Sequence, residues 1–185
     1  MSYSIIFLGN TGVGKTSLIS QCKLENLPWT TFPATEIKPE KKKNGLITEV
    51  VLWDTPGEKR FQSEVRRLCE RIYKNDTYGA VLVYDIHNRE SYEAAKQWAT
   101  ELKAMKEDNI REIVLIGNKV DIPGGRVVTK EEAEGYAKQH DLGFQEISAK
   151  TTQVQFYQDI VSKLFCDDIT RCREMLKDFR SRNSE

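Results

Sequence analysis

The chain has 185 residues with 28 basic and 28 acidic side chains, a formal net charge of zero, and 39% hydrophobic residues. This size suits one globular domain with a full core, and the balanced charge argues against a nucleic-acid partner, which would require a basic surplus. The amino terminus lacks the basic segment of a signal peptide, and no apolar run is long enough to span a membrane. The four cysteines form no CxxC pair. We therefore expect reduced thiols and a cytoplasmic protein.

Apolar runs alternate with helical patterns along the chain, which is typical of βαβ units and a mostly parallel sheet. In chain order we predict a strand at residues 4–8, a helix at 14–24, an irregular segment at 25–37, a hairpin at 38–53, a helix at 61–74, a strand at 78–85, a helix at 89–106, a strand at 112–118, a helix at 129–140, a strand at 144–147 and helix from 152 onward. Asn88 is expected to begin one of these helices, and Thr129 with Glu132 forms a predicted capping box.

The predicted hairpin pairs residues 38–43 with residues 46–53 around Asn44-Gly45, a dipeptide that favours a type I′ turn. With it the chain has six strands and five helices. The expected fold is therefore an α/β, doubly wound, six-stranded, mostly parallel sheet with one antiparallel edge strand. In such a fold ligands bind at the carboxyl ends of the parallel strands.

The strongest motif is a glycine-rich loop between the first strand and the first helix. It reads Gly9-Asn10-Thr11-Gly12-Val13-Gly14-Lys15-Thr16, followed by Ser17, and matches GxxxxGK[ST] at every fixed position. Backbone N–H groups of such a loop and the helix N-terminus favour a bound anion. We predict that residues 9–17 bind the phosphates of a nucleotide, that Lys15 bridges the terminal phosphates and that the Thr16 hydroxyl binds magnesium. The alternative is an ordinary glycine-rich turn, which the strand–loop–helix context disfavours.

Two further segments indicate the base. Asn118-Lys119-Val120-Asp121 follows one apolar strand, and Ser148-Ala149-Lys150 follows the next. The Asp121 carboxylate can accept hydrogen bonds from guanine N1–H and its 2-amino group, whereas adenine has no matching pair of donors. The stem of Lys119 can cover the base, and the Ala149 amide can donate to guanine O6. We therefore predict that guanine is bound by Asn118, Lys119, Asp121, Ser148, Ala149 and Lys150.

Asp54-Thr55-Pro56-Gly57 ends the second hairpin arm and predicts a second magnesium contact, with Asp54 acting through a water. The Gly57 amide is expected to bond the gamma-phosphate. Thr35 is the expected second hydroxyl on magnesium, with Thr30 and Thr31 as rivals. One of Trp29 and Phe32 is expected to stack on guanine.

These motifs resemble the Ras superfamily, and the Rab branch most closely. The resemblance is carried by GNTGVGKTS, WDTPGEKRF, LVYDIHNRESYEAAKQW, IGNKVD and EISAKT. It implies a G domain at residues 1–166, a helical tail at 167–185, and a monomeric GTP/GDP switch with Mg²⁺. It also implies an exchange factor, a GTPase-activating protein and effectors, none of which the sequence identifies.

The chain departs from the Rab pattern at several positions. Glu58 stands where the family has a glutamine that orients the attacking water, so we expect slow hydrolysis, with Lys15, Thr35, Gly57 and Glu58 as the catalytic set. The first switch lacks the usual Ile-Gly-Val-Asp-Phe. Glu40 and Leu68 stand in place of effector-reading aromatics, although Trp53 is kept. The chain ends RSRNSE without a cysteine to prenylate. Either a natural lipidated tail, which would give reversible membrane association, has been removed, or this member is not lipidated.

Two other functions compete with the switch. One is a hydrolysis-deficient module that holds guanine nucleotide and presents a fixed surface to a partner. Glu58 favours this module, whereas the complete Lys15, Thr16 and Asp54 set opposes it. The other is a P-loop kinase or ATPase, which Asp121 disfavours because it selects guanine.

Overall fold

The computed structural model describes residues 2–21, 29–33, 49–75, 77–105 and 110–151. The strands are β1 (Ser2–Leu8), β2 (Trp29–Pro33), β3 (Glu49–Asp54), β4 (Thr77–Asp85), β5 (Ile110–Asn118) and β6 (Gly143–Glu146). The helices are α1 (Lys15–Gln21), α2 (Gln62–Asn75), α3 (Arg89–Ala104) and α4 (Lys130–Gln139), with a short 3-10 helix η1 (Lys59–Phe61) before α2.

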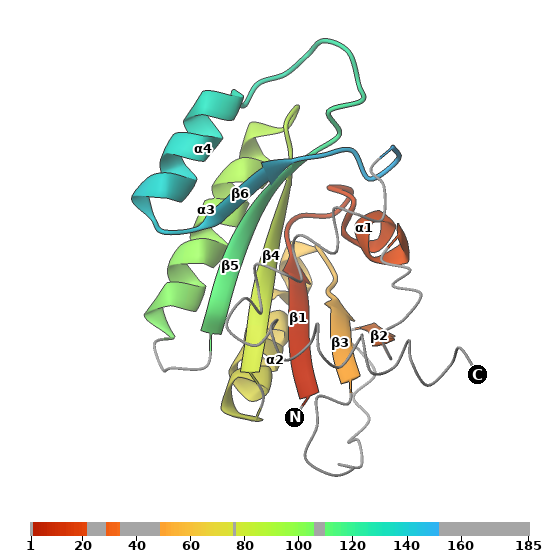
Figure 1. Ribbon diagram of the computed structural model, residues 1–185, viewed down its shortest axis with the longest axis vertical. Helices are drawn as coiled ribbons and strands as arrows, with labels where there is room; N and C mark the ends of the chain where they lie inside the picture. Colours follow the sequence, from red (N-terminus) through yellow and green to blue (C-terminus); the bar gives the residue numbers. More distant parts are fainter. Residues whose placement is uncertain (1, 22–28, 34–48, 76, 106–109, 152–185) are drawn as a thin grey trace, which may run out of the picture.

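In the described residues the sheet has six strands in the order β2-β3-β1-β4-β5-β6, and each neighbouring pair is parallel. The carboxyl ends of β1, β3, β4 and β5 therefore share one edge, which is uppermost in Figure 1. The loops that follow these strands carry the predicted nucleotide motifs. The α/β fold with a parallel sheet is confirmed, and it brings residues far apart in sequence to a single edge.

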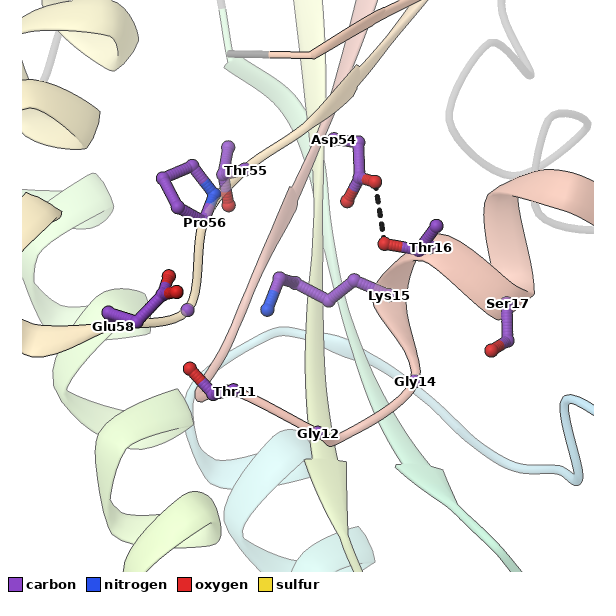
Figure 2. A pocket seen from close by; sticks show the side chains of 11 residues that line it. Thr11, Gly12, Gly14, Lys15, Thr16, Ser17, Asp54, Thr55, Pro56 and Glu58 are labelled. Carbon is purple, nitrogen blue, oxygen red and sulfur yellow. Dashed lines mark hydrogen bonds between the residues drawn. The ribbon is translucent and has the colours of Figure 1, made fainter. Parts of the chain in front are cut away.

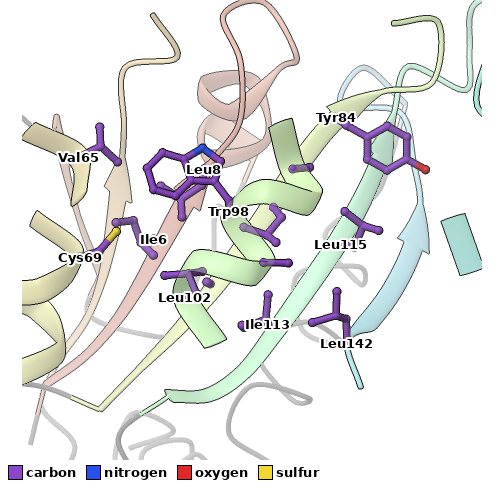
Figure 3. Close-up of a cluster of buried hydrophobic side chains, with 14 of the residues drawn as sticks. Ile6, Leu8, Val65, Cys69, Tyr84, Trp98, Leu102, Ile113, Leu115 and Leu142 are labelled. Carbon is purple, nitrogen blue, oxygen red and sulfur yellow. The ribbon is translucent and has the colours of Figure 1, made fainter. Parts of the chain in front are cut away.

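The core lies between one face of the sheet and helices α2, α3 and α4. Figure 3 shows side chains from β1, β4 and β5 meeting those of α2 and α3. Alternate residues of β1 explain why two layers form, because Ile6 and Leu8 join this core while Ile5 and Phe7 point to the opposite face. Ile5 and Phe7 are buried as well, so β1 is covered on both faces, as expected for a central strand of a parallel sheet.

The predicted helix starts at α3 and α4 are confirmed by their caps. The Asn88 side chain accepts a hydrogen bond from the Ser91 amide, and the Thr129 hydroxyl accepts one from the Glu132 amide. Each cap satisfies an N–H group that has no partner inside its own helix. Cys69 of α2 is free, and burial raises the pKa of its thiol to about 12, which agrees with the expectation of a reduced, inert side chain.

The edge of the sheet differs from the prediction. Residues 29–33 were expected to be irregular, but they form β2, which pairs in parallel with β3 from Val50 to Asp54. Aromatic and β-branched residues favour a strand here, and a proline is tolerated on an edge strand. The predicted hairpin arm 38–43 and its turn lie outside the described residues. The antiparallel edge strand is not confirmed, because β2 runs parallel along the free side of β3.

Candidate functional site

A cavity of about 510 Å³ opens where the loop after β1 faces the loop after β3 (Figure 2). It is lined by Thr11, Gly12, Gly14, Lys15, Thr16, Ser17, Asp54, Thr55, Pro56, Gly57 and Glu58. The lining therefore combines the predicted phosphate loop with the segment predicted to bind magnesium and the gamma-phosphate. The two segments meet at the contact between Thr16 and Asp54, which are 38 residues apart in the sequence.

The backbone conformation of the loop after β1 requires glycine at positions 9 and 14. Gly9 has a φ of +145°, and a Cβ at this position would lie 2.1 Å from the Val83 carbonyl oxygen on β4. Gly14 has a φ of +101°, and its Cβ would lie 2.2 Å from the Asn118 side-chain nitrogen. L side chains are disfavoured at such φ values. Glycine thus allows the loop to lie directly against β4 and against the base-binding segment.

Lys15 extends from the start of α1 into this cavity. Its ammonium donates to the carbonyl oxygens of Gly9, at 2.7 Å, and Asn10, at 3.0 Å. Burial lowers the pKa of Lys15 from its ordinary value, while the charges of Asp54 and Glu58 act in the opposite direction. A buried cation needs an anion nearby to offset its lost hydration. The cavity is therefore suited to a phosphate.

The residues expected to hold magnesium lie together. The Thr16 hydroxyl donates to Asp54 Oδ2 at 2.6 Å. The other carboxylate oxygen of Asp54, Oδ1, is buried without a hydrogen-bond partner among the described residues. Hydroxyl and carboxylate oxygens are the donors that Mg²⁺ prefers, and the lone pairs of Asp54 Oδ1 are not taken by a hydrogen bond from the described residues. This donor set fits magnesium.

Asn118 joins the phosphate loop to the base-binding loops. Its Nδ2 donates to the Val13 carbonyl at 2.7 Å, and its Oδ1 accepts from the Lys119 amide at 2.7 Å and the Ala149 amide at 2.9 Å. The side chain is buried, so all three hydrogen bonds are shielded from water. One residue at the end of β5 thus fixes the spacing between the phosphate subsite and the base subsite.

The base-binding groups lie beyond Asn118. A hydrogen bond with Ser148 lowers the pKa of Asp121, and the Lys150 ammonium lies 3.8 Å from the Asp121 carboxylate. Asp121 therefore stays ionised at neutral pH, as acceptance of two hydrogen bonds from guanine requires. Lys119 has a φ of +73° and an ammonium 2.8 Å from Asp85 Oδ2. The sequence reasoning missed this role of Asp85, although an acidic residue at the end of the neighbouring strand was a usable signal.

Gly57 brings the loop after β3 onto the phosphate loop. A Cβ at Gly57 would lie 2.3 Å from the Thr11 nitrogen and 2.4 Å from the Asn10 carbonyl carbon. The preceding Thr55 is buried and donates to the Phe7 carbonyl at 2.5 Å, which fixes the start of the loop. Glu58 follows as an exposed residue that lines the cavity, so its carboxylate faces the same space as the Lys15 ammonium (Figure 2).

Some predicted residues are not brought into the site by the structure. Thr35 lies outside the described residues. Trp29, Thr30, Thr31 and Phe32 belong to β2, of which only the backbone is described, so the stacking and hydroxyl roles stay predictions. Of the positions compared with the effector-reading aromatics, Trp53 and Leu68 are buried in the core, and Trp53 donates to Ser4 Oγ at 3.1 Å. Glu40 lies outside the described residues.

Comparisons with known proteins agree with this geometry. The family model described as the Ras family matches residues 4–166. The chain belongs to the Ras family. This Ras-family chain is 33% identical over 155 residues to the Ras-related protein Rab-26 of Bos taurus, covering 82% of the chain and 58% of the relative. It is 31% identical over 179 residues to the Ras-related protein Rab-21 of Homo sapiens, covering 95% of the chain and 73% of the relative.

These relatives make the Ras-family chain Rab-like, as the motifs predicted. The chain spans less than two thirds of the length of the Rab-26 relatives it matches. Among the described residues, none of the helices combines the length and the apolar character needed to cross a bilayer.

Proposed function

We propose that this Rab-like protein binds GTP with Mg²⁺, hydrolyses it slowly to GDP, and acts as a molecular switch in membrane trafficking. The observation that carries the proposal is the Asn118 side chain, which holds the cavity containing Lys15 at a fixed distance from the Asp121 carboxylate. A phosphate-binding cavity alone fits any nucleoside triphosphate. The Asp121 carboxylate next to this cavity favours guanine, because adenine would leave the carboxylate without hydrogen-bond donors.

Each residue has an assigned task in this proposal. Residues 9–17 wrap the phosphates, and Lys15 offsets the negative charge that develops as water attacks the gamma-phosphate. Thr16 and Asp54 would hold the magnesium ion, which supplies additional positive charge at the phosphates. Thr35 and Gly57 sense the gamma-phosphate, and their loops relax after it is lost. Base recognition falls to Asn118, Lys119, Asp121, Ser148, Ala149 and Lys150.

Partners and boundaries follow from the Rab similarity. We assign the G domain to residues 1–166 and a helical tail to 167–185, and the extent of the family match supports this boundary. As a switch the protein would be a monomer served by an exchange factor, a GTPase-activating protein and effectors. The trafficking role and reversible membrane association rest on the Rab similarity alone.

The slow rate is assigned to Glu58. A carboxylate in the cavity repels the anionic gamma-phosphate and lacks the N–H donor of the usual glutamine. We expect Glu58→Gln to accelerate single-turnover GTP hydrolysis by roughly tenfold, the effect of one gained charge-assisted contact. Glu70→Gln, an exposed position on α2 outside the cavity lining, is the matched control. Equal rates for Glu58→Gln and the unmodified protein would refute the assignment.

The alternative is a hydrolysis-deficient module that holds guanine nucleotide, and Glu58 in the cavity is the observation that favours it. Chromatography of the nucleotide released by denaturing the purified protein separates the possibilities. Bound GDP, with GTP turned over in a single-turnover assay, supports the switch. Bound GTP that is not turned over supports the module. Adenine nucleotide, or no nucleotide and no guanine binding, would overturn both.

A further inference from the structure

Three side chains behind the base subsite form a connected cluster that the proposed reaction does not use directly. Asp85 ends β4, and its strand partner Asn118 ends β5, so Lys119 lies one residue beyond the paired ends. Asp85 Oδ2 is 2.8 Å from the Lys119 ammonium. Asp85 Oδ1 accepts from the His87 backbone amide at 2.9 Å and lies 3.1 Å from His87 Nδ1. One carboxylate oxygen thus serves the lysine, and the other serves the histidine.

The Asp85 carboxylate is a fixed part of this cluster. Burial by itself would raise the pKa of Asp85, but hydrogen bonds from Lys119 and His87 hold that pKa below its ordinary value. Its backbone is held too, because the Asp85 amide donates to the Ser91 hydroxyl at 3.0 Å, and the Asn88 amide donates to the Asp85 carbonyl. The Asp85 backbone is therefore held in place, and the carboxylate stays ionised with its two oxygens held by Lys119 and His87.

The His87 ring is held between Asp85 and the loop after β5. Its Nδ1 lies within hydrogen-bond distance of a carboxylate oxygen, which only accepts, so Nδ1 is the donor of this contact. The other ring nitrogen, Nε2, is buried with no hydrogen-bond partner in the described part of the chain. The ring lies beneath the loop after β5, since a Cβ at Gly125 would be 3.5 Å from His87 Cδ2. The charged groups facing it are Asp85, Lys119 and Asp121.

We propose that His87 is a positioning residue of the guanine site: its ring holds Asp85 against the Lys119 ammonium, and loss of the ring speeds release of guanine nucleotide. Without the ring, the only hydrogen bond from the described residues that Asp85 Oδ1 keeps is that of the His87 backbone amide. The carboxylate can then turn away from Lys119, and the stem of Lys119 loses the contact that orients it over the base.

This inference rests on the proposed guanine-nucleotide function, and the test separates the two. Release of a fluorescent GDP analogue from the full chain with magnesium would be followed at pH 8. His87→Ala removes the contact, whereas His87→Asn keeps an amide donor in place of Nδ1. The chain has two histidines, so His140→Asn is the matched control. His140 stacks on Tyr136 at the end of α4, with 4.3 Å between ring centroids.

At pH 8 we expect His87→Ala to release the analogue on the order of tenfold faster, and His87→Asn to stay near the unmodified rate. His140→Asn should also keep the unmodified rate. An unmodified rate for His87→Ala, or equally fast release from His87→Ala and His87→Asn, would overturn the inference and leave the proposed function standing. Failure of the unmodified protein to retain the analogue would overturn the proposed function itself.

Discussion

Gly57 is the residue at which the loop after β3 touches the phosphate loop. There is no space for a side chain, because a Cβ would lie 2.3 Å from the Thr11 nitrogen and 2.4 Å from the Asn10 carbonyl carbon. Both neighbours are backbone atoms, which cannot move aside as a flexible side chain could. Any larger residue must separate the two loops that line the cavity, and with them the groups assigned to the gamma-phosphate and to the attacking water.

Gly57→Ala should therefore impair hydrolysis much more than binding of GDP. A displacement of about 1 Å at a reacting site can cost roughly a hundredfold in rate, so single-turnover GTP hydrolysis should fall by about that factor. GDP affinity should change less, because the base-binding groups lie away from this contact and only the Asn10 carbonyl, which accepts from Lys15, borders both. Gly135→Ala, where nothing lies within 4 Å of the added Cβ, is the control. A Gly57→Ala protein that hydrolyses GTP at the unmodified rate would show that this loop contact is not needed.

At the residue scale, the sequence predicted the site through motifs in which each residue type has one chemical reason. Lys15, Thr16, Asp54 and Asp121 could be named because phosphate, magnesium and guanine each require a particular donor or acceptor. The contacts of Asn118 with Val13 could not be derived, because they join residues 105 positions apart. The interaction of Asp85 with Lys119 could not be derived either, because it depends on the register between β4 and β5, which a single sequence does not give.

Among the elements, α4 carries a glycine in its interior. Gly135 is exposed in the middle of this helix, and a Cβ there would meet open space. Glycine in a helix interior costs about 0.5–1 kcal/mol relative to alanine. We expect Gly135→Ala to raise the free energy of unfolding in urea by about that amount. Glu134→Ala, an exposed change between two good helix formers, should have little effect, and a destabilised Gly135→Ala would contradict the expectation.

Helices α2 and α3 are joined by an ion pair between Arg66 and Glu101. Arg66 donates twice to the Glu101 carboxylate, both times at 2.8 Å, and its guanidinium lies 5.7 Å from the centre of the Trp98 ring. Hydrogen bonding from Arg66 is the main reason that the pKa of Glu101 is lowered from 4.5. A carboxylate with a lowered folded-state pKa stabilises the fold above its unfolded-state pKa, and this contribution is lost as pH falls through the folded-state value.

A double-mutant cycle with Arg66→Ala and Glu101→Ala should therefore give a coupling energy of about 0.5–1 kcal/mol at pH 7, a modest value because the pair is partly exposed. The coupling should vanish as the pH of urea unfolding is lowered through the region below 4.5, where Glu101 becomes protonated. The exposed Lys59–Glu90 pair, with N–O distance 2.7 Å, is the comparison and should couple less. Coupling that persists at acid pH would mean that packing, rather than charge, joins these helices.

Element type was predictable wherever the hydrophobic pattern was long, as for β4, α3 and β5. The strand at the edge of the sheet, β2, was not predictable, and the reason is physical. Its five residues end in Pro33, and a proline between apolar residues argues for a loop unless the strand is at an edge. Whether a segment lies at an edge is decided by its partner strand, here β3, and not by its own residues.

For the whole molecule, the site exists only when the sheet is assembled. The cavity combines loops that follow β1 and β3, and Asn118 on β5 ties it to the base subsite. An unfolded chain therefore offers no nucleotide site, and a ligand that binds only the native state must stabilise it by mass action. Thermal unfolding thus reports binding and selectivity in one measurement, without any assumption about hydrolysis.

At a GDP concentration a thousandfold above its dissociation constant, the stabilisation should be about 4 kcal/mol. For a chain of this length each kcal/mol shifts Tm by about 2–4 °C, so GDP with magnesium should raise Tm by roughly 10 °C. ADP should give almost no shift, and EDTA should reduce the GDP shift because Thr16 and Asp54 lose their ion. Without ligand, Asp121→Ala should lose only the stabilisation from the hydrogen bond between Asp121 and Ser148, yet with ligand it should lose most of the GDP shift. Equal shifts from ADP and GDP would show that Asp121 does not select the base.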